Sequence, residues 1–186
     1  MKRIIVAVTG ASGIPLAITC LEELRKNHCE IHLIVSSGAK QTLAIETKLT
    51  YQQMIALADV IHDNQNIGDN IASGTYPVDG IIVIPCSMKT LSAIRNGYDD
   101  CLINRAVDVN IKEQRPVILV PREAPLSPIH LDHMAFLSRL PRVFIIPAML
   151  TYYNQPTTIK DMEIHLTGKI LDKFGLQVKD YRRWNG

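Results

Sequence analysis

Short runs of β-branched and aliphatic residues alternate along this chain with stretches of helical periodicity, and no other feature of the sequence limits the possible folds as strongly. The expected strands are Arg3–Val8, Glu30–Val35, Gly80–Pro85, Val117–Pro121 and Arg142–Pro147. Strands that alternate with helices in this way predict right-handed βαβ crossovers. The expected fold class is therefore α/β, with a doubly wound parallel sheet.

Seven helical stretches connect and follow these strands. They are Pro15–Asn27, Gly38–Thr47, Thr50–Ala58, Met88–Ile94, Asp99–Lys112, a helix capped by Ser127 that runs to about Arg139, and one capped by Thr158 that runs to about Phe174, where Gly175 stops it. Aromatic residues make up only 5% of the chain, so the core consists mainly of aliphatic residues, as in parallel strands buried on both faces. A length of 186 residues favours one domain, 1–186.

Composition and charge limit the partners. The formal net charge is only +2, and the basic residues are too scattered to suggest a surface for nucleic acid or for a membrane. The apolar run from Ile4 to Val8 is too short for the core of a signal peptide, and no apolar stretch approaches the roughly 18 residues that span a bilayer. We therefore expect a cytoplasmic protein with a small-molecule partner.

Metal-ligating patterns are missing from the sequence. His130 and His133 are three residues apart but have no third ligand nearby, and Asp99-Asp100 lacks the further aspartate of an aspartate-rich diphosphate motif. The four cysteines form no C-x-x-C pair and predict neither a zinc site nor a disulfide framework: Cys20, Cys29, Cys86 and Cys101. We expect no metal.

The first expected strand runs into a glycine-containing turn, Thr9–Pro15, that opens a helix and presents backbone N–H groups to an anion or a polar ring. A purely structural strand-to-helix turn is the alternative. The dinucleotide fingerprint also needs a third glycine and an acidic residue about 20 positions later. Here the second strand ends in Ser36-Ser37, which disfavours NAD.

Two further strand ends carry polar residues. The third strand ends in Pro85-Cys86-Ser87-Met88-Lys89-Thr90, which would suit a phosphate, although Ser87 could simply cap the next helix. The fourth ends in a proline-rich loop with Arg122 and Glu123, which a surface ion pair would also explain. In doubly wound sheets ligands bind beyond the carboxyl ends of the strands. We therefore expect a ligand site where four residues converge: Ser12, Ser36, Ser87 and Arg122.

Arg105 and Lys112 lie seven residues apart on one face of an expected helix and could hold an anion together. Asp108 lies between them at helical spacing, so a solvated salt-bridge ladder explains the three residues equally well. Glu46, near the end of its helix, would ordinarily be a solvated surface residue.

Several segments together resemble the UbiX/Pad flavin prenyltransferases, in order and approximate spacing over essentially the whole chain. The segments are Gly10-Ala11-Ser12-Gly13, Pro85-Cys86-Ser87-Met88-Lys89-Thr90, Arg122-Glu123-x-Pro125-Leu126, a Tyr-rich turn ending in Pro156, and Arg182-Arg183-Trp184-x-Gly186. The resemblance implies a flavodoxin-like Rossmann fold of three α/β/α layers with a C-terminal helix and tail, about 176–186, that closes the site or an interface. It also implies a homo-oligomer, a dodecamer, that binds FMN between subunits.

The family transfers a dimethylallyl group from dimethylallyl monophosphate to N5 and C6 of reduced FMN without a metal. Its product, prenylated FMN, serves UbiD-type aromatic acid decarboxylases. By resemblance, FMN would contact Gly10, Ala11, Ser12, Ser36, Ser87, Met88, Lys89, Thr90 and Arg122. The prenyl phosphate would be held by Ser73, Arg105, Lys112, Arg122, Tyr153 and Lys169. Glu123 would donate a proton to the departing phosphate, Ser12 and Glu46 would relay protons, and Trp184 would help close the site.

The chain departs from the family pattern at two of these positions. Lys169 stands where many members have arginine, and Tyr152 could replace Tyr153 because the segment before Pro156 is one residue longer. The runs Ile14-Pro15-Leu16 and Pro125-Leu126-Ser127 are closer to the Pad-like branch, which accompanies hydroxyaryl-acid decarboxylases. The choice between a monophosphate and a diphosphate donor stays open. The competing hypotheses are an FMN-dependent aromatic acid decarboxylase subunit and a flavin carrier without prenyl-transfer activity.

Overall fold

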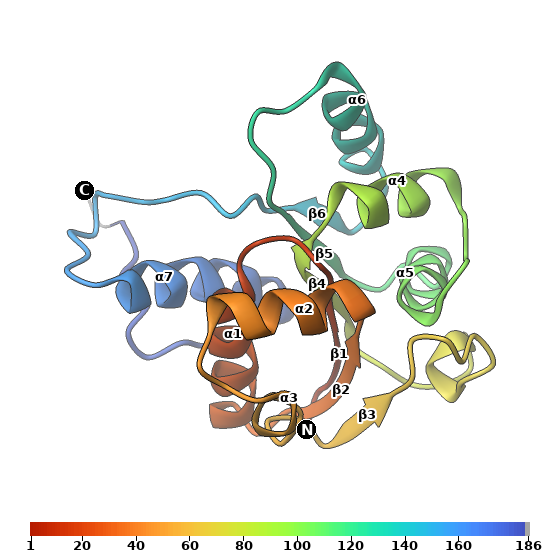
Figure 1. Ribbon diagram of the computed structural model, residues 1–186, viewed down its shortest axis with the longest axis horizontal. Helices are drawn as coiled ribbons and strands as arrows, with labels where there is room; N and C mark the ends of the chain where they lie inside the picture. Colours follow the sequence, from red (N-terminus) through yellow and green to blue (C-terminus); the bar gives the residue numbers. More distant parts are fainter. Residues whose placement is uncertain (185–186) are drawn as a thin grey trace.

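The computed structural model describes residues 1–184 and contains one six-stranded sheet in which every neighbouring pair of strands is parallel. The strands are β1 (Arg3–Val8), β2 (Glu30–Val35), β3 (Val60–His62), β4 (Gly80–Cys86), β5 (Val117–Pro121) and β6 (Val143–Ile145), in the spatial order β3-β2-β1-β4-β5-β6 (Figure 1). The order reverses direction between β1 and β4, so the carboxyl ends of these two strands flank the crevice where such sheets bind ligands.

The helices are α1 (Ile14–Lys26), α2 (Ser37–Glu46), α3 (Tyr51–Ile55), α4 (Met88–Asn96), α5 (Leu102–Lys112), α6 (Pro128–Leu137) and α7 (Ile159–Leu171), with short 3₁₀ helices η1 (Asn70–Ala72) and η2 (Asp172–Phe174). The hydroxyls of Ser127 and Thr158 accept backbone N–H groups and cap α6 and α7, as expected from the sequence. Gly175 ends the last helical segment in the left-handed conformation, also as expected.

Alternate residues of β1 belong to two separate apolar clusters. Ile4, Val6 and Val8 pack on one face of the sheet, with buried residues of α1, α2, α3 and α7. Ile5 and Ala7 pack on the other face, with α4, α5 and α6. The period of two along the strand thus places helices on both sides, and the three-layer α/β/α fold predicted from the sequence is confirmed.

The helix expected over Thr50–Ala58 is shorter, Tyr51–Ile55, and η1 was not expected. Three further differences have a clear physical reason. β3 was not expected, because it has only three residues at the edge of the sheet, too few to produce a hydrophobic pattern. α5 begins at Leu102 behind Cys101 rather than at Asp99, since Asp99 and Asp100 lie in the turn that precedes the helix. β6 is shorter than Arg142–Pro147, because only Val143–Ile145 pair with β5.

The C-terminal segment folds back onto α7. Tyr181 lies so close to Gly168 that any side chain at that glycine would collide with its ring. Trp184 contacts Tyr153 edge to face, with ring centroids 5.4 Å apart. The last two residues of the expected tail, 185 and 186, lie outside the described residues. Along residues 1–184, no helix has the length and apolar character to cross a membrane.

Candidate active site

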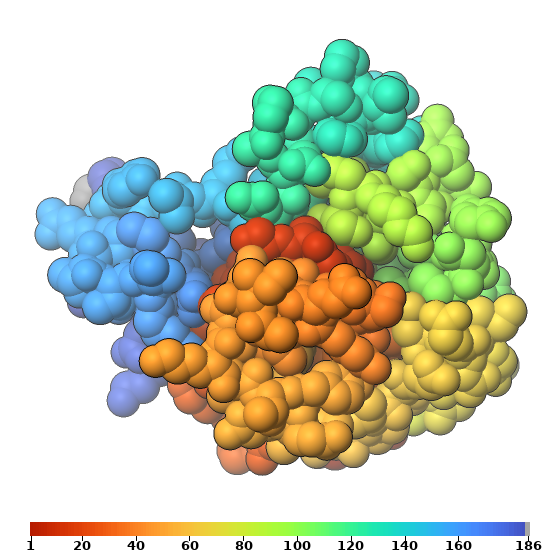
Figure 2. Space-filling view, in the orientation of Figure 1, coloured from red at the N-terminus to blue at the C-terminus, as the bar shows by residue number. Residues whose placement is uncertain are grey.

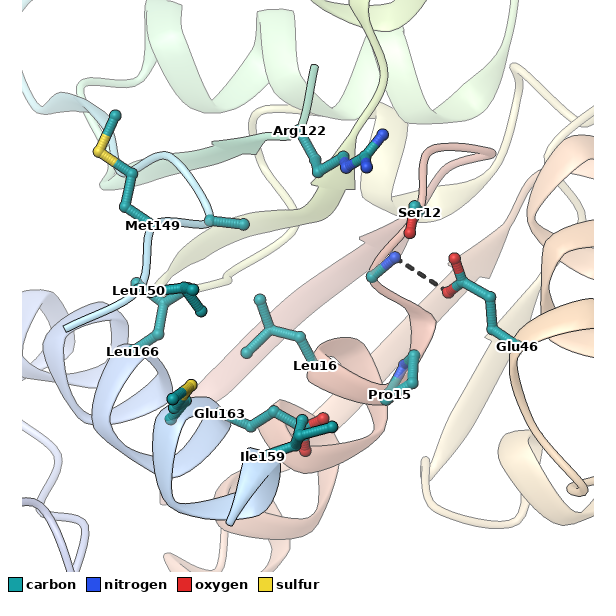
Figure 3. Close-up of a pocket in the computed structure, with 13 residues that line it drawn as sticks. Ser12, Pro15, Leu16, Glu46, Arg122, Met149, Leu150, Ile159, Glu163 and Leu166 are labelled. Carbon is teal, nitrogen blue, oxygen red and sulfur yellow. Dashed lines mark hydrogen bonds between the residues drawn. The ribbon is translucent and has the colours of Figure 1, made fainter. Parts of the chain in front are cut away.

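A cavity of about 600 Å³ opens at the carboxyl edge of the sheet, next to the ends of β1 and β5. Figure 3 shows its walls, in which the turn after β1, Arg122 after β5 and the first turns of α7 face one another. Its lining residues are Ser12, Gly13, Pro15, Leu16, Glu46, Arg122, Ala148, Met149, Leu150, Ile159, Met162, Glu163 and Leu166. Polar groups gather at one end of a pocket whose other walls are mostly apolar.

Ser12, Glu46 and Arg122 form the polar end of the cavity. Glu46, at the last position of α2, accepts hydrogen bonds from the backbone N–H groups of Gly13, at 2.9 Å, and Ile14, at 2.8 Å. The dashed line in Figure 3 marks the bond from Gly13. Gly13 precedes α1 with a φ of 124°, a conformation that favours glycine and turns both N–H groups toward the carboxylate. The carboxylate therefore occupies the amino end of α1, where the helix dipole favours negative charge.

Glu46 is held in its ionised form. Burial alone would raise the pKa of its carboxyl group, but the Ser12 hydroxyl, the N–H groups of Gly13 and Ile14 and the charge of Arg122 together lower that pKa below its ordinary value. A carboxylate that remains ionised beside a hydroxyl group can accept a proton from it or through it. This pair is the clearest acid-base element of the cavity.

Thr9 ties the turn after β1 to the turn after β4. Its hydroxyl donates to the carbonyl of Pro85 at 2.7 Å and accepts from the N–H of Ser87 at 2.8 Å, and the side chain is buried. On the other side Gly10 lies against Gly38, because a Cβ on Gly10 would come within 3.0 Å of the Gly38 backbone. Three strand ends thus meet at this edge, as the sequence predicted. Figure 2 shows the turn after β1, in red, exposed between α2, in orange, and the segment after β5, in teal.

The expected flavin-binding serines act as helix caps. Ser36 accepts the N–H of Ala39 at 3.1 Å, and Ser87 accepts that of Thr90 at 3.3 Å. Each therefore lies at the amino end of a helix that opens at the ligand edge, and capping does not exclude contact with an anion there. The side chain of Lys89 lies outside the cavity, 3.4 Å from Asp100.

Arg105 and Lys112 are engaged in ion pairs within the chain and do not line the cavity. Arg105 lies 3.3 Å from Asp99 and 3.0 Å from Asp108, while Lys112 lies 2.6 Å from Glu113. Ser73, on the segment after η1, exchanges a hydrogen bond with Thr75 at 2.9 Å. In one chain these three expected phosphate ligands are thus separate from Arg122.

Tyr153, Lys169 and Trp184 form another separate group on the C-terminal part of the chain. The Tyr153 hydroxyl lies 3.2 Å from Nε2 of His165, and Tyr153 lines a hollow together with Trp184. Lys169 lies one helical turn after His165. Burial of the His165 imidazole, together with the positive charge of Lys169, lowers the pKa of that imidazole. Tyr152 is more exposed than Tyr153, and its hydroxyl has no such partner within the described residues 1–184, so Tyr153 is the better candidate. Glu123 is exposed, and its carboxylate accepts the N–H of Ala124 at 3.0 Å.

Sequence reasoning missed the apolar walls of the cavity. Ile159, Met162 and Leu166 follow one another at helical spacing on α7, a stripe that would ordinarily indicate core packing. Met149 and Leu150 come from a segment without regular structure, where no periodicity signals a role. Glu163 also faces the cavity, where its carboxylate accepts the hydroxyl of Thr19 at 2.7 Å.

Comparison with known proteins agrees with these features. The family model described as Flavoprotein matches residues 1–171. Flavin prenyltransferase LpdB of Lactiplantibacillus plantarum is 46% identical over 187 residues, covering all of both chains. The crystal structure of AnUbiX in complex with FMN and dimethylallyl pyrophosphate is 42% identical, with a TM-score of 0.97 over 100% of this chain and 98% of that one.

A second solved structure covers the whole of both chains. It is described as a dodecameric FMN-dependent UbiX-like decarboxylase from Escherichia coli O157:H7 and is 46% identical, with a TM-score of 0.96. Because these matches cover the whole chain, they include the segments that form the cavity, the helix caps and the C-terminal aromatic group. The chain belongs to the UbiX-like flavin prenyltransferases, within the flavoprotein family.

Proposed function

We propose that this protein transfers a dimethylallyl group from a dimethylallyl phosphate to N5 and C6 of reduced FMN and so makes prenylated FMN. The observation that carries the proposal is the arrangement of Ser12, Glu46 and Arg122 at the polar end of an apolar cavity. A relative of the same fold has been crystallised with FMN and dimethylallyl pyrophosphate, which supports both ligands. The bound flavin supplies the nucleophilic ring positions.

The residues at the strand ends fit a flavin. Gly10 and Gly38 approach too closely for side chains, which leaves backbone and short side chains at the surface of the turn after β1. The amino ends of α1, α2 and α4 open at the same edge, where N–H groups favour a phosphate or a polar ring. We assign the FMN contacts to residues of these turns and to Arg122 after β5. The residues are Gly10, Ala11, Ser12, Ser36, Ser87, Met88, Lys89, Thr90 and Arg122.

Cleavage of an allylic carbon–oxygen bond leaves a cation-like fragment and a phosphate that carries the electron pair. Arg122 can stabilise that negative charge through two parallel hydrogen bonds. The aliphatic walls, among them Leu16 and Leu166, keep water away from the allylic fragment. Glu46, already ionised and lining the cavity together with Ser12, is suited to take up the proton that the acceptor loses. Glu123 lies one residue beyond Arg122 and is assigned the proton transfer to the phosphate.

We further propose that copies of the chain complete one another's sites. The other phosphate ligands of the family pattern form two groups remote from Arg122 within one chain: Ser73, Arg105 and Lys112, and Tyr153 and Lys169. A dodecameric relative supports an assembly in which these groups meet Arg122 across subunit boundaries. The ion pairs of Arg105 and Lys112 then keep these cations in position until a phosphate is bound.

The donor and the recipient of the product belong to the same proposal. We assign dimethylallyl monophosphate as the donor. AnUbiX was crystallised with dimethylallyl pyrophosphate, so the two donors should be compared in the same assay. Prenylated FMN would pass to a UbiD-type aromatic acid decarboxylase.

The direct test is incubation of the purified protein with reduced FMN and either donor, followed by mass spectrometry of the flavin. We expect the flavin to gain one five-carbon unit, and faster with the monophosphate. An unchanged flavin with both donors would contradict the function. Release of CO₂ from an aromatic acid by this protein alone would instead support a decarboxylase activity, the activity in the description of the Escherichia coli relative.

A further inference from the structure

A row of polar side chains, with two buried histidines at its centre and a partly exposed carboxylate at each end, crosses from β2 to η1, apart from the cavity. His32 on β2 and His62 on β3 are 0% and 6% exposed, and their rings stack with centroids 5.0 Å apart. Nδ1 of His32 lies 2.8 Å from Nε2 of His62. The outer nitrogens face carboxylates, with His32 Nε2 3.0 Å from Glu30 and His62 Nδ1 2.8 Å from Asp69.

These three contacts require three ring protons. A carboxylate only accepts, so each outer nitrogen must carry a proton, and one of the two inner nitrogens must donate to the other. Two neutral imidazoles carry only two N–H groups in total. With two protons, a lone pair would face a carboxylate or another lone pair at about 3 Å. The row is therefore complete only when the pair holds one extra proton.

The surrounding charges balance a single extra proton. The guanidinium of Arg3 lies 2.9 Å from Glu30, so two cations and two anions make up the row when the pair is singly charged. Tyr76 meets His32 edge to face and brings no charge of its own. Burial, and after it the charge of His62, lowers the pKa of His32, although Glu30 opposes both effects. A second extra proton is disfavoured on geometry, because it would place two N–H groups against each other between the rings, 2.8 Å apart.

The row ends on the segment that carries Ser73. The Asp69 carboxylate that meets His62 also accepts the N–H of Ile71 at 3.3 Å and so caps η1. Beyond Ser73, Arg115 donates to the carbonyl of Gly74 at 2.7 Å, and a Cβ on Gly74 would lie 2.8 Å from Nζ of Lys112. The segment is thus fixed at one end by the histidine row and at the other by Arg115, just after the end of α5.

We propose that His32 and His62 share one extra proton at neutral pH, and that this charged pair, through Asp69, positions the segment that presents Ser73 beside Lys112. His32, His62 and Asp69 are then positioning residues for the prenyl phosphate. The positioning role rests on the proposed function, whereas the proton count does not.

The proton count is tested by ¹⁵N NMR of the protein labelled at histidine, followed across neutral pH. We expect three ring protons on the pair in the unaltered chain, and two in Asp69→Asn, which keeps the shape of the carboxylate but removes its charge. Glu30→Gln provides a second variant with the same expected loss. If the unaltered chain carried only two ring protons on this pair at neutral pH, the proposal of a shared extra proton would be wrong.

The positioning role is tested by steady-state kinetics of Asp69→Asn. We expect KM for the dimethylallyl phosphate to rise by roughly threefold to tenfold, the effect of one weakened hydrogen bond from Ser73, with FMN affinity unchanged. The matched control is Asp63→Asn, since Asp63 precedes η1 and its carboxylate accepts the N–H of the nearby Gln65, at 3.0 Å. An unchanged KM in an Asp69→Asn protein that has lost the proton would overturn the positioning role. Failure of the unaltered protein to modify FMN would overturn the proposed function and leave the NMR result standing.

Discussion

The carboxylate of Glu46 accepts the backbone N–H of Gly13 at 2.9 Å, although 33 residues separate them. This contact joins the end of α2 to the start of α1 and places an ionised acid beside Ser12. An exposed helix-end glutamate would contribute little to either stability or chemistry. Here the tertiary fold gives it a structural role at the helix terminus and a chemical role in the cavity.

Glu46→Gln should reduce the rate of prenyl transfer by about 10²-fold to 10⁴-fold, because the amide keeps the shape but cannot accept a proton. The rate of five-carbon addition to FMN measures the effect. Glu22→Gln is the control, since Glu22 makes a surface ion pair with Lys160 at 2.7 Å. Equal rates in the two variants would rule out proton transfer by Glu46.

The same carboxylate should affect acid stability with a definite sign. The pKa of Glu46 is lower in the folded protein than its ordinary value of 4.5, so its stabilising contribution is complete above 4.5 and is lost as the pH falls through the folded pKa. We expect the difference in unfolding free energy between the unaltered protein and Glu46→Gln to shrink on acidification. Urea denaturation from neutral into acidic pH measures it. A difference that grows on acidification would contradict the lowered pKa.

Arg122→Ala should weaken binding of the prenyl donor, and it should also slow cleavage at saturation, because Arg122 is assigned to the charge left on the departing phosphate. The loss of a charge-assisted hydrogen bond costs about 1.5 to 3 kcal/mol, or roughly tenfold to a hundredfold in KM. Initial rates against donor concentration measure this effect, with Arg139→Ala, an exposed arginine on the turn after α6, as the control. A donor KM unchanged by Arg122→Ala would contradict the assignment.

Gly10→Ala should separate the turn after β1 from α2. The new methyl group would lie 3.0 Å from the Gly38 backbone, so we expect a loss of about 1 to 3 kcal/mol of stability together with weaker FMN binding. Thermal unfolding and flavin titration measure the two effects. Gly68→Ala, whose methyl group would have no neighbour closer than 3.7 Å, should leave both unchanged. Unaltered flavin affinity in Gly10→Ala would argue against a flavin at this turn.

Mixed assemblies test whether one site uses several chains. Glu46→Gln and Lys112→Ala each remove a different part of the proposed site, and we expect the two inactive proteins to regain activity when they are produced together. Some sites of the mixed oligomer would then receive Glu46 from one copy and Lys112 from another. Activity no greater than that of the separate variants would indicate that each chain carries a complete site.

The sequence predicted much of this architecture because its signals are local. Strand residues such as Ile4 and Ile5 are buried on opposite faces, so an unbroken apolar run already indicates a sheet covered on both sides. Ser127, Thr158 and Gly175 act within one helical turn of where they stand, and all three ended or capped helices as predicted. β3 escaped prediction because its three residues depend on pairing with β2 rather than on a pattern of their own.

By itself the sequence determined the parallel α/β fold, the polar strand ends and the family resemblance, all of which depend on residue type and spacing along the chain. The tertiary structure alone decided which of those residues meet. Glu46 reaches Gly13, and Arg122 faces Ser12, because packing of α2 and β5 brings distant segments to one edge of the sheet. Arg105 and Lys112 point into ion pairs of their own, because α5 packs on the opposite face of the sheet from α1 and α2. Spacing fixes the face on which a side chain lies, whereas only three-dimensional packing fixes what it touches.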